Sequence, residues 1–130
     1  MFKKYKIDIL KYKNLWYARI IWKRGAEKMS EKIYTIEEIK NMLSELLKDK
    51  PVYQVILFGS YAKQKATKKS DVDLIIDTNS ELKGFALLKL ICQIEEKLQK
   101  EIDGFEKYEI MEDSLIDKEI KETGVVVYEK

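Results

Sequence analysis

The sequence predicts an α/β domain in which one mixed sheet of about four strands is backed by helices. Short β-rich apolar runs alternate along the chain with longer stretches whose apolar residues recur at helical spacing. The 130 residues, of which 45% are hydrophobic, also suffice for one domain with a modest core. The predicted order is helix, strand, strand, helix, strand, helix, strand.

The first half of this domain is predicted to contain one helix and two strands. Thr35 followed by Glu38 has the pattern of a capping box, and apolar residues at helical spacing continue to Leu47. Pro51, the only proline of the chain, follows the end of that helix. Two apolar runs separated by a polar connection come next. We expect strands at residues 52–58 and 71–76, with a turn or helical turn at residues 61–69 between them.

The second half is predicted to contain a long helix, a third strand, a short helix and a closing strand. Apolar residues at helical spacing predict the long helix over residues 82–100. Gly104 is expected to separate this helix from the third strand. Asp113 or Ser114 can cap the short helix, which ends near Gly124. The expected strands are residues 105–111 and, at an edge of the sheet, residues 125–128.

Composition excludes several classes of site. Histidine is absent and Cys92 is the only cysteine. An internal disulfide, a zinc site of paired Cys and His, and any mechanism that needs a histidine base are therefore excluded. No apolar run reaches the roughly 20 residues of a membrane span, and residues 1–9 lack the uncharged core of a signal peptide. We therefore expect a cytoplasmic protein.

The first 28 residues differ from the rest in charge. They hold nine Lys or Arg and two Asp or Glu, whereas residues 29–130 hold 16 basic and 21 acidic residues. Three interpretations remain open: a basic, aromatic arm that contacts nucleic acid, an extra strand or hairpin, or a segment upstream of a natural start at Met29. The third is suggested by Arg24-Gly25, which a purine-rich tract of the ribosome-binding type can encode. The main domain is predicted at residues 29–130, and direct nucleic-acid binding is not expected.

The clearest chemical pattern lies where the first two predicted strands meet their polar connection. Asp71 and Asp73 stand at i and i+2 of a strand, so both project from the same face. Two such carboxylates repel each other unless a cation lies between them, and Mg²⁺ or Mn²⁺ suits oxygen ligands. Gly59 lets a phosphate approach the backbone, while Ser60 and the following amides can donate to it. Each feature alone also fits an ordinary strand end or turn.

The combination resembles the signature of the minimal nucleotidyltransferases, a branch of the DNA polymerase β-like superfamily. That signature is Gly-Ser-x-Ala-Arg-Gly, a spacer, and then Ser-Asp-x-Asp-Leu. Here the two parts are GSYAKQ at residues 59–64 and SDVDL at residues 70–74, and the resemblance extends over residues 33–130. It implies the polymerase β-like fold, ATP as substrate and two Mg²⁺ ions. It also implies a nucleotide-binding set of Gly59, Ser60, Lys63 and Ser70.

The resemblance further implies a third carboxylate on the strand after the long helix. The candidates are Glu106, Glu109 and Glu112, and counting back from the following Asp-Ser-Leu selects Glu109. Glutamate is one methylene longer than the aspartate that is usual in the family. The catalytic and metal-binding set expected from the sequence is therefore Asp71, Asp73 and Glu109.

A second departure from the family pattern is Lys63-Gln64 in place of Arg-Gly. Lysine can supply charge to a triphosphate, but it lacks the bidentate fork of arginine. Residues 29–130 contain no arginine at all. Both departures bear on how efficiently the site would catalyse.

The activity implied by the resemblance is transfer of AMP from ATP to a hydroxyl of a partner protein. Stand-alone members of the family act as antitoxins of helical HEPN-type ribonuclease toxins, so the implied assembly is a hetero-oligomer with such a toxin. Two alternatives remain open. The chain can be a non-catalytic binding module that neutralises its partner by contact, which the two departures favour. It can also be the catalytic subunit of an enzyme that modifies a small molecule such as an antibiotic.

Overall fold

The structure, a computed structural model, describes residues 30–130. The three interpretations of the first 28 residues fall outside this range. Within it the helices are α3 (Ile36–Leu47), α4 (Gly59–Ala62), α5 (Phe85–Leu98) and α6 (Leu115–Thr123), with a short 3₁₀ helix η1 (Lys107–Glu109). The strands are β1 (Gln54–Phe58), β2 (Val72–Asp77), β3 (Ile102–Glu106) and β4 (Val125–Glu129).

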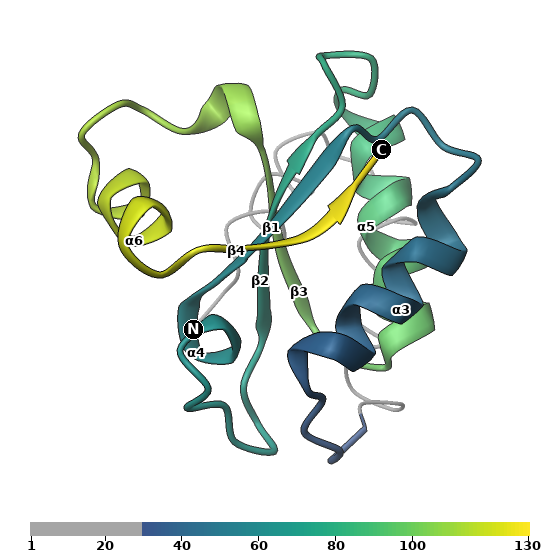
Figure 1. The fold of residues 1–130 in the computed structure, drawn as a ribbon. Coiled ribbons are helices and arrows are strands. Elements are labelled where there is room, and N and C mark those ends of the chain that lie inside the picture. Colours follow the sequence, from purple (N-terminus) through teal and green to yellow (C-terminus); the bar gives the residue numbers. More distant parts are fainter. Residues whose placement is uncertain (1–29) are drawn as a thin grey trace.

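The four strands form one mixed sheet in the order β3-β2-β1-β4. β1 pairs antiparallel with β2 and β4, whereas β2 pairs parallel with β3 through the α5 crossover. Helices α3 and α5 lie on one face of the sheet and α6 lies on the other (Figure 1). The predicted fold class and the edge position of the last strand are therefore confirmed.

Helix α3 begins as the sequence predicts. The Thr35 hydroxyl accepts a hydrogen bond from the Glu38 amide at 3.1 Å, and the Glu38 carboxylate accepts one from the Thr35 amide at 2.9 Å. This reciprocal capping satisfies two amides that the helix itself leaves without acceptors. The inward face of α3 consists of Ile39, Leu43 and Leu47, which are fully buried against the sheet and α5.

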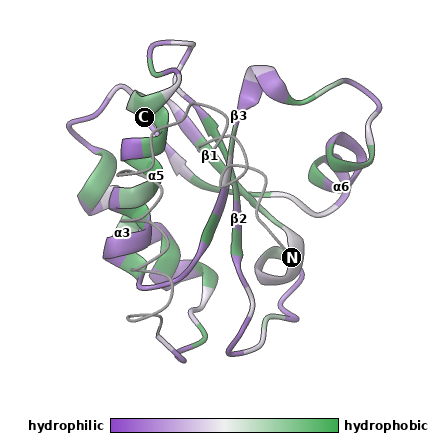
Figure 2. Ribbon diagram, turned by 180° about the vertical axis from the view of Figure 1, so that it is seen from behind, coloured by the Kyte–Doolittle hydropathy of each residue, from purple (hydrophilic) through white to green (hydrophobic). Residues whose placement is uncertain are grey.

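Strand alternation gives the sheet two different faces. Leu57 of β1 and Leu74 of β2 are paired and fully buried in the core cluster under α3 and α5. Asp73 and Ile75 flank Leu74 and therefore project from the opposite face. The face under α3 and α5 forms the core, while the face toward α6 carries Asp73. Figure 2 shows the domain from behind, coloured by hydropathy.

The third strand lies earlier in the sequence than predicted. Gly104 does not separate helix from strand but occupies the centre of β3. A Cβ added there would lie 2.9 Å from Cδ1 of Ile91, so glycine at this position lets α5 pack closely on β3. The expected strand at residues 105–111 is thus wrong, and Glu109 lies beyond the strand in η1.

The part of the chain that the structure describes, residues 30–130, contains no helix with the length and apolar character that a membrane crossing requires.

The close approach of α5 to β3 can be tested at Gly104. We expect Gly104→Ala to lower the free energy of unfolding by about 1 kcal/mol or more, because the new methyl overpacks the contact with Ile91. Ile91→Val removes the Cδ1 atom that the methyl would meet, so the loss should be smaller in that background. Urea denaturation of both single variants and the double variant measures the coupling. Equal losses in both backgrounds would contradict this account of Gly104.

Candidate active site

The carboxylate of Asp73 lies directly against Gly59. The two strands that carry them pair so that Phe58, the last residue of β1, is opposite Asp73. A Cβ added to Gly59 would lie only 2.2 Å from the Asp73 Oδ2 atom, and Gly59 has a φ of +76°. A side chain is therefore disfavoured at Gly59 by both space and backbone conformation. The structure brings together one residue from each half of the predicted motif.

The start of α4 offers backbone donors beside this carboxylate. Its N-cap is Phe58, whose side chain makes no capping hydrogen bond. The first amides of a helix have no acceptor within the helix, so those of α4 can donate to an anion such as a phosphate. Ser60, which is partly exposed, places its hydroxyl in the same turn.

Asp71 immediately precedes β2 and is partly exposed. The Val72 amide donates to the Glu101 carbonyl at 2.9 Å, so the pairing of β2 with β3 extends to the start of the strand. Alternation along an extended chain then places Asp71 on the same side as Asp73. Asp71 also lines a hollow of about 330 Å³, together with residues 68–70 and Lys100.

Asp103 adds a carboxylate on this face, and it is not among the residues predicted from the sequence. In the parallel pairing of β2 with β3, Asp73 is the register partner of Asp103, and the next pair on the same face is Ile75 with Phe105. Register partners on adjacent strands share a face, so Asp103 projects beside Asp73. Once Gly104 is part of the strand, alternation shows that Asp103 points away from Ile102 and Gly104, but its place beside Asp73 depends on the register with β2.

Glu109 lies in η1 and its carboxylate binds a backbone amide there. One of its carboxylate oxygens accepts a hydrogen bond from the Glu106 amide at 3.0 Å and so caps η1. Its predicted position on the third strand is therefore wrong. Asp71, Asp73 and Asp103 lie on one face at the start of β2 and in β3, near Gly59, whereas Asp77 at the far end of β2 pairs with Lys107 at 3.7 Å.

These three side chains supply only oxygen atoms, the ligands that Mg²⁺ prefers. Among residues 30–130, no three acidic, histidine or cysteine side chains are gathered closely enough to form a ready-made metal site. The type and placement of the donors fit Mg²⁺, and binding would require the side chains to close around the ion.

A buried glutamate fixes the ends of β2 and β3 relative to each other. Glu106 is 1% exposed and accepts hydrogen bonds from the Thr78 hydroxyl at 2.9 Å and the Thr78 amide at 3.3 Å. Burial raises the pKa of the Glu106 carboxyl, and the hydrogen bonds from Thr78 partly oppose that change. Because Thr78 follows β2 and Glu106 ends β3, this contact helps to hold Asp103 beside Asp73.

The other two predicted nucleotide-binding residues have partners within the protein. Lys63 Nζ lies 3.6 Å from Glu119 Oε1 of α6. The Ser70 hydroxyl accepts a hydrogen bond from the Thr67 amide at 2.7 Å and so closes the turn before β2. Lys100, which is 2% exposed, holds the same loop by donating to the Lys68 carbonyl at 3.1 Å. Burial lowers the pKa of the Lys100 ammonium.

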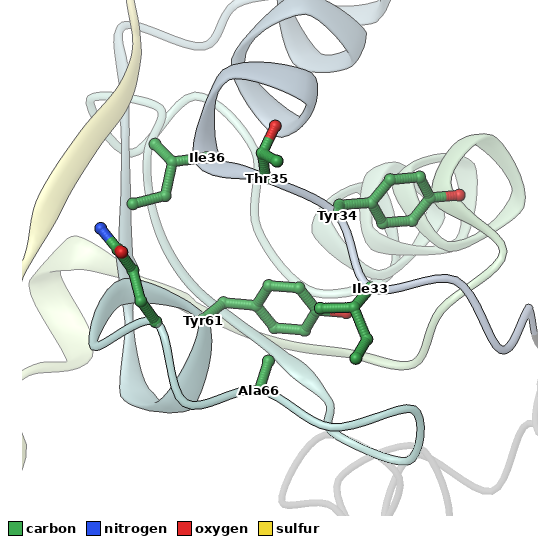
Figure 3. Close-up of a pocket in the computed structure, with 7 residues that line it drawn as sticks. Ile33, Tyr34, Thr35, Ile36, Tyr61 and Ala66 are labelled. Carbon is green, nitrogen blue, oxygen red and sulfur yellow. The ribbon is translucent and has the colours of Figure 1, made fainter.

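A second hollow of about 320 Å³ lies between α4 and the chain that enters α3 (Figure 3). Tyr61 lies across it and is 2% exposed, and burial raises the pKa of its hydroxyl. Tyr61 belongs to the core cluster, so its side chain anchors α4. Gln64, which also lines this hollow, has a φ of +58°, a conformation that favours glycine. The glycine of the family signature corresponds to this position.

Comparisons with known proteins agree with this geometry. The family model described as "Polymerase beta, Nucleotidyltransferase" matches residues 37–130. The chain belongs to the polymerase β-like nucleotidyltransferase family. The resemblance identified from the two motifs is thereby confirmed, and the chain is a nucleotidyltransferase.

Two similar proteins come from Methanocaldococcus jannaschii, and each is named "Putative protein adenylyltransferase". MJ1379 is 34% identical over 99 residues, which cover 72% of this chain and 98% of the relative. MJ0141 is 40% identical over 86 residues, which cover 66% of this chain and 75% of the relative.

Solved structures of toxin–antitoxin complexes contain a similar fold. One is a crystal structure of a toxin-antitoxin with AMP-PNP, with a TM-score of 0.60 and 19% identity over 70% of this chain and 73% of the other. Another is the tri-AMPylated Shewanella oneidensis HEPN toxin in complex with MNT antitoxin, with a TM-score of 0.56 and 17% identity over 74% of each chain. At these identities the likeness shows the shared fold.

The contact between Gly59 and Asp73 predicts different results at two glycines. We expect Gly59→Ala to weaken ATP binding and to lower the free energy of unfolding by about 1–3 kcal/mol, because the new methyl meets Asp73. Gly84→Ala is the matched control, since Gly84 also has a positive φ but a Cβ there would meet nothing within 4 Å. Gly84→Ala should lower the free energy of unfolding, measured by urea denaturation. It should leave ATP affinity unchanged, measured by calorimetric titration. An equal loss of ATP binding in both variants would show that the contact between Gly59 and Asp73 is not what ATP binding depends on.

The backbone of Gln64 leads to a separate prediction about stability. Gln64→Gly should raise the free energy of unfolding by about 0.5–1 kcal/mol, because glycine adopts a positive φ without steric cost. Gln64→Ala is the control that removes the side chain and keeps the unfavourable backbone, so it should bring no gain. Thermal and urea denaturation check both, and a gain in the alanine variant would show that the side chain is the cause.

Proposed function

We propose that this chain is a Mg²⁺-dependent adenylyltransferase that transfers AMP from ATP to a hydroxyl of a partner protein. One observation carries the proposal: Asp73 touches Gly59 on one side and has Asp103 as its register partner on the other. Asp73 therefore lies next to both the turn that can bind phosphate and the second carboxylate of the pair, Asp103. The names of the two M. jannaschii relatives support a protein as the acceptor.

The residues divide into two groups by chemistry. Asp71, Asp73 and Asp103 would hold the metal ions, while the α4 amides and the Ser60 hydroxyl would donate to the triphosphate oxygens. When bound, Mg²⁺ neutralises phosphate charge and lowers the pKa of the acceptor hydroxyl. The acceptor oxygen then forms a bond to the α-phosphorus, the bond to the leaving oxygen breaks, and pyrophosphate departs. The hydroxyl proton passes to solvent. Asp103 replaces Glu109 as the candidate third ligand.

We further propose that the acceptor is a HEPN-type toxin and that this chain is its antitoxin. The support is the fold shared with chains from toxin–antitoxin structures, one of which contains an AMPylated HEPN toxin with MNT antitoxin. A chain that uses ATP and silences a ribonuclease would act in the cytoplasm, which is the location we propose.

A second candidate function is a binding module that neutralises the toxin by contact alone. The observation in its favour is that Lys63 pairs with Glu119 of α6. While it pairs with Glu119, Lys63 is not available to bind the triphosphate, as the sequence pattern predicts it to do.

The carboxylates provide the test of the proposed function. Asp73→Asn and Asp103→Asn should each lower AMP transfer at least about 100-fold, because each weakens metal binding while keeping side-chain volume. Glu109→Gln is the matched control and should stay within about two-fold of the wild type, since Glu109 lies in η1. The assay mixes labelled ATP, Mg²⁺ and the purified product of the gene next to this one, and follows label on that protein.

Two results would overturn the assignment. Loss of transfer in Glu109→Gln with full activity in Asp103→Asn would restore Glu109 as the third ligand. A wild-type chain that binds the partner tightly, transfers no label and inhibits its ribonuclease activity would establish the binding module instead.

A further inference from the structure

The most exposed large apolar side chains of the described residues fall within one connection. Tyr108 is 57% exposed, Met111 is 76% exposed and Leu115 is 85% exposed. All three lie between the start of η1 and the first residue of α6. The other exposed large apolar side chains, such as Ile33 at 46%, are less exposed and come from separate parts of the chain. Exposed apolar side chains concentrated in one segment are typical of an interaction surface.

The fold explains why this segment is not covered. From η1 the chain leads away from the sheet before it returns as α6, on the face opposite α3 and α5 (Figure 1). No residue of α6 is fully buried, although Ile116 and Ile120 are partly so. In the view from behind, α6 shows both hydrophobic and hydrophilic colours (Figure 2). Within residues 30–130, the fold therefore leaves more than half of each of these side chains exposed.

The connection itself is acidic, while Lys107 precedes it and Lys83 Nζ lies 5.9 Å from the centre of the Tyr108 ring. Residues 108–117 include four acidic residues and no lysine or arginine. Glu109, Glu112 and Asp113 are exposed, while Asp117 pairs with Lys121 at 3.0 Å. An apolar centre with an acidic edge is complementary to a protein surface that is apolar at its centre and basic at its edge.

The same connection leads to the candidate active site. It continues into α6, whose Glu119 lies 3.6 Å from Lys63, just after α4. α6 also packs on β1, whose last residue, Phe58, directly precedes Gly59. A protein seated on the connection would therefore lie on the face that carries Asp73 and Asp103.

We propose that Tyr108, Met111 and Leu115 form the docking surface for the protein acceptor. The acceptor presents an apolar patch bordered by lysine or arginine, and the acidic side chains of residues 109–113 orient it. This inference rests on the proposed function, because it names the surface by which the adenylated partner is held. The surface is defined by these three residues and is separate from the carboxylates that would bind metal.

The test measures binding in the absence of ATP. The probe is the purified product of the gene next to this one, titrated into the full chain. Leu115→Asp should weaken binding at least about ten-fold, because it places a charge at the apolar centre. An acidic residue in the first turn of α6 suits the helix, so this variant should fold. Ile33→Asp is the matched control and should bind within about two-fold of the wild type, since Ile33 precedes α3.

A charge reversal tests the acidic edge separately. Glu112→Lys should weaken binding at low salt and reduce its salt dependence, whereas Glu45→Lys on α3 should leave both unchanged. ATP binding should stay at the wild-type level in Leu115→Asp and Glu112→Lys. A partner that binds through this surface but receives no label would refute the proposed enzyme activity and keep the docking surface.

Two outcomes would overturn the docking surface itself. One is wild-type affinity in Leu115→Asp. The other is a homodimer of the wild-type chain that Leu115→Asp dissociates, seen by analytical ultracentrifugation, because the surface would then be occupied by a second copy.

Discussion

The parallel pairing of β2 with β3 is the constraint on which the rest of the site depends. Its register makes Asp73 and Asp103 partners, and a shift by one residue would turn Asp103 toward α5. Two contacts hold that register from the helix-covered face. Gly104 lets α5 approach β3 closely, and the buried Glu106 binds Thr78 at the far end of both strands. Contacts within the core thus fix the positions of Asp73 and Asp103, although both carboxylates lie outside the core.

The contact of Gly59 with Asp73 explains how an apolar strand can carry acidic residues. Because Asp73 projects from the face opposite α3 and α5, its charge remains outside the core and avoids the large cost of burial. The absence of a side chain at Gly59 then leaves room for its carboxylate beside the first amides of α4. The pairing of Phe58, the last residue of β1, with Asp73 places the Asp73 carboxylate beside the first backbone amides of α4.

Local patterns in the sequence predicted the local parts of this structure. The capping box at Thr35, the two strands joined by the polar connection, and the Gly59 and Asp73 motifs each depend on residues close in sequence. Asp103 depends on the register between strands 30 residues apart, which no local pattern contains. Gly104 shows the same limit, because a glycine that permits close packing looks like a strand break until its neighbour Ile91 is known.

The pair formed by Lys63 and Glu119 does not conflict with a role for Lys63 at the triphosphate. Both side chains are more than one third exposed, at 39% and 36%, and an ion pair of this kind contributes about 0–1 kcal/mol. A triphosphate carries several negative charges and would compete strongly for the lysine. Since Glu119 belongs to α6, release of Lys63 would couple the nucleotide to the helix that follows the exposed connection.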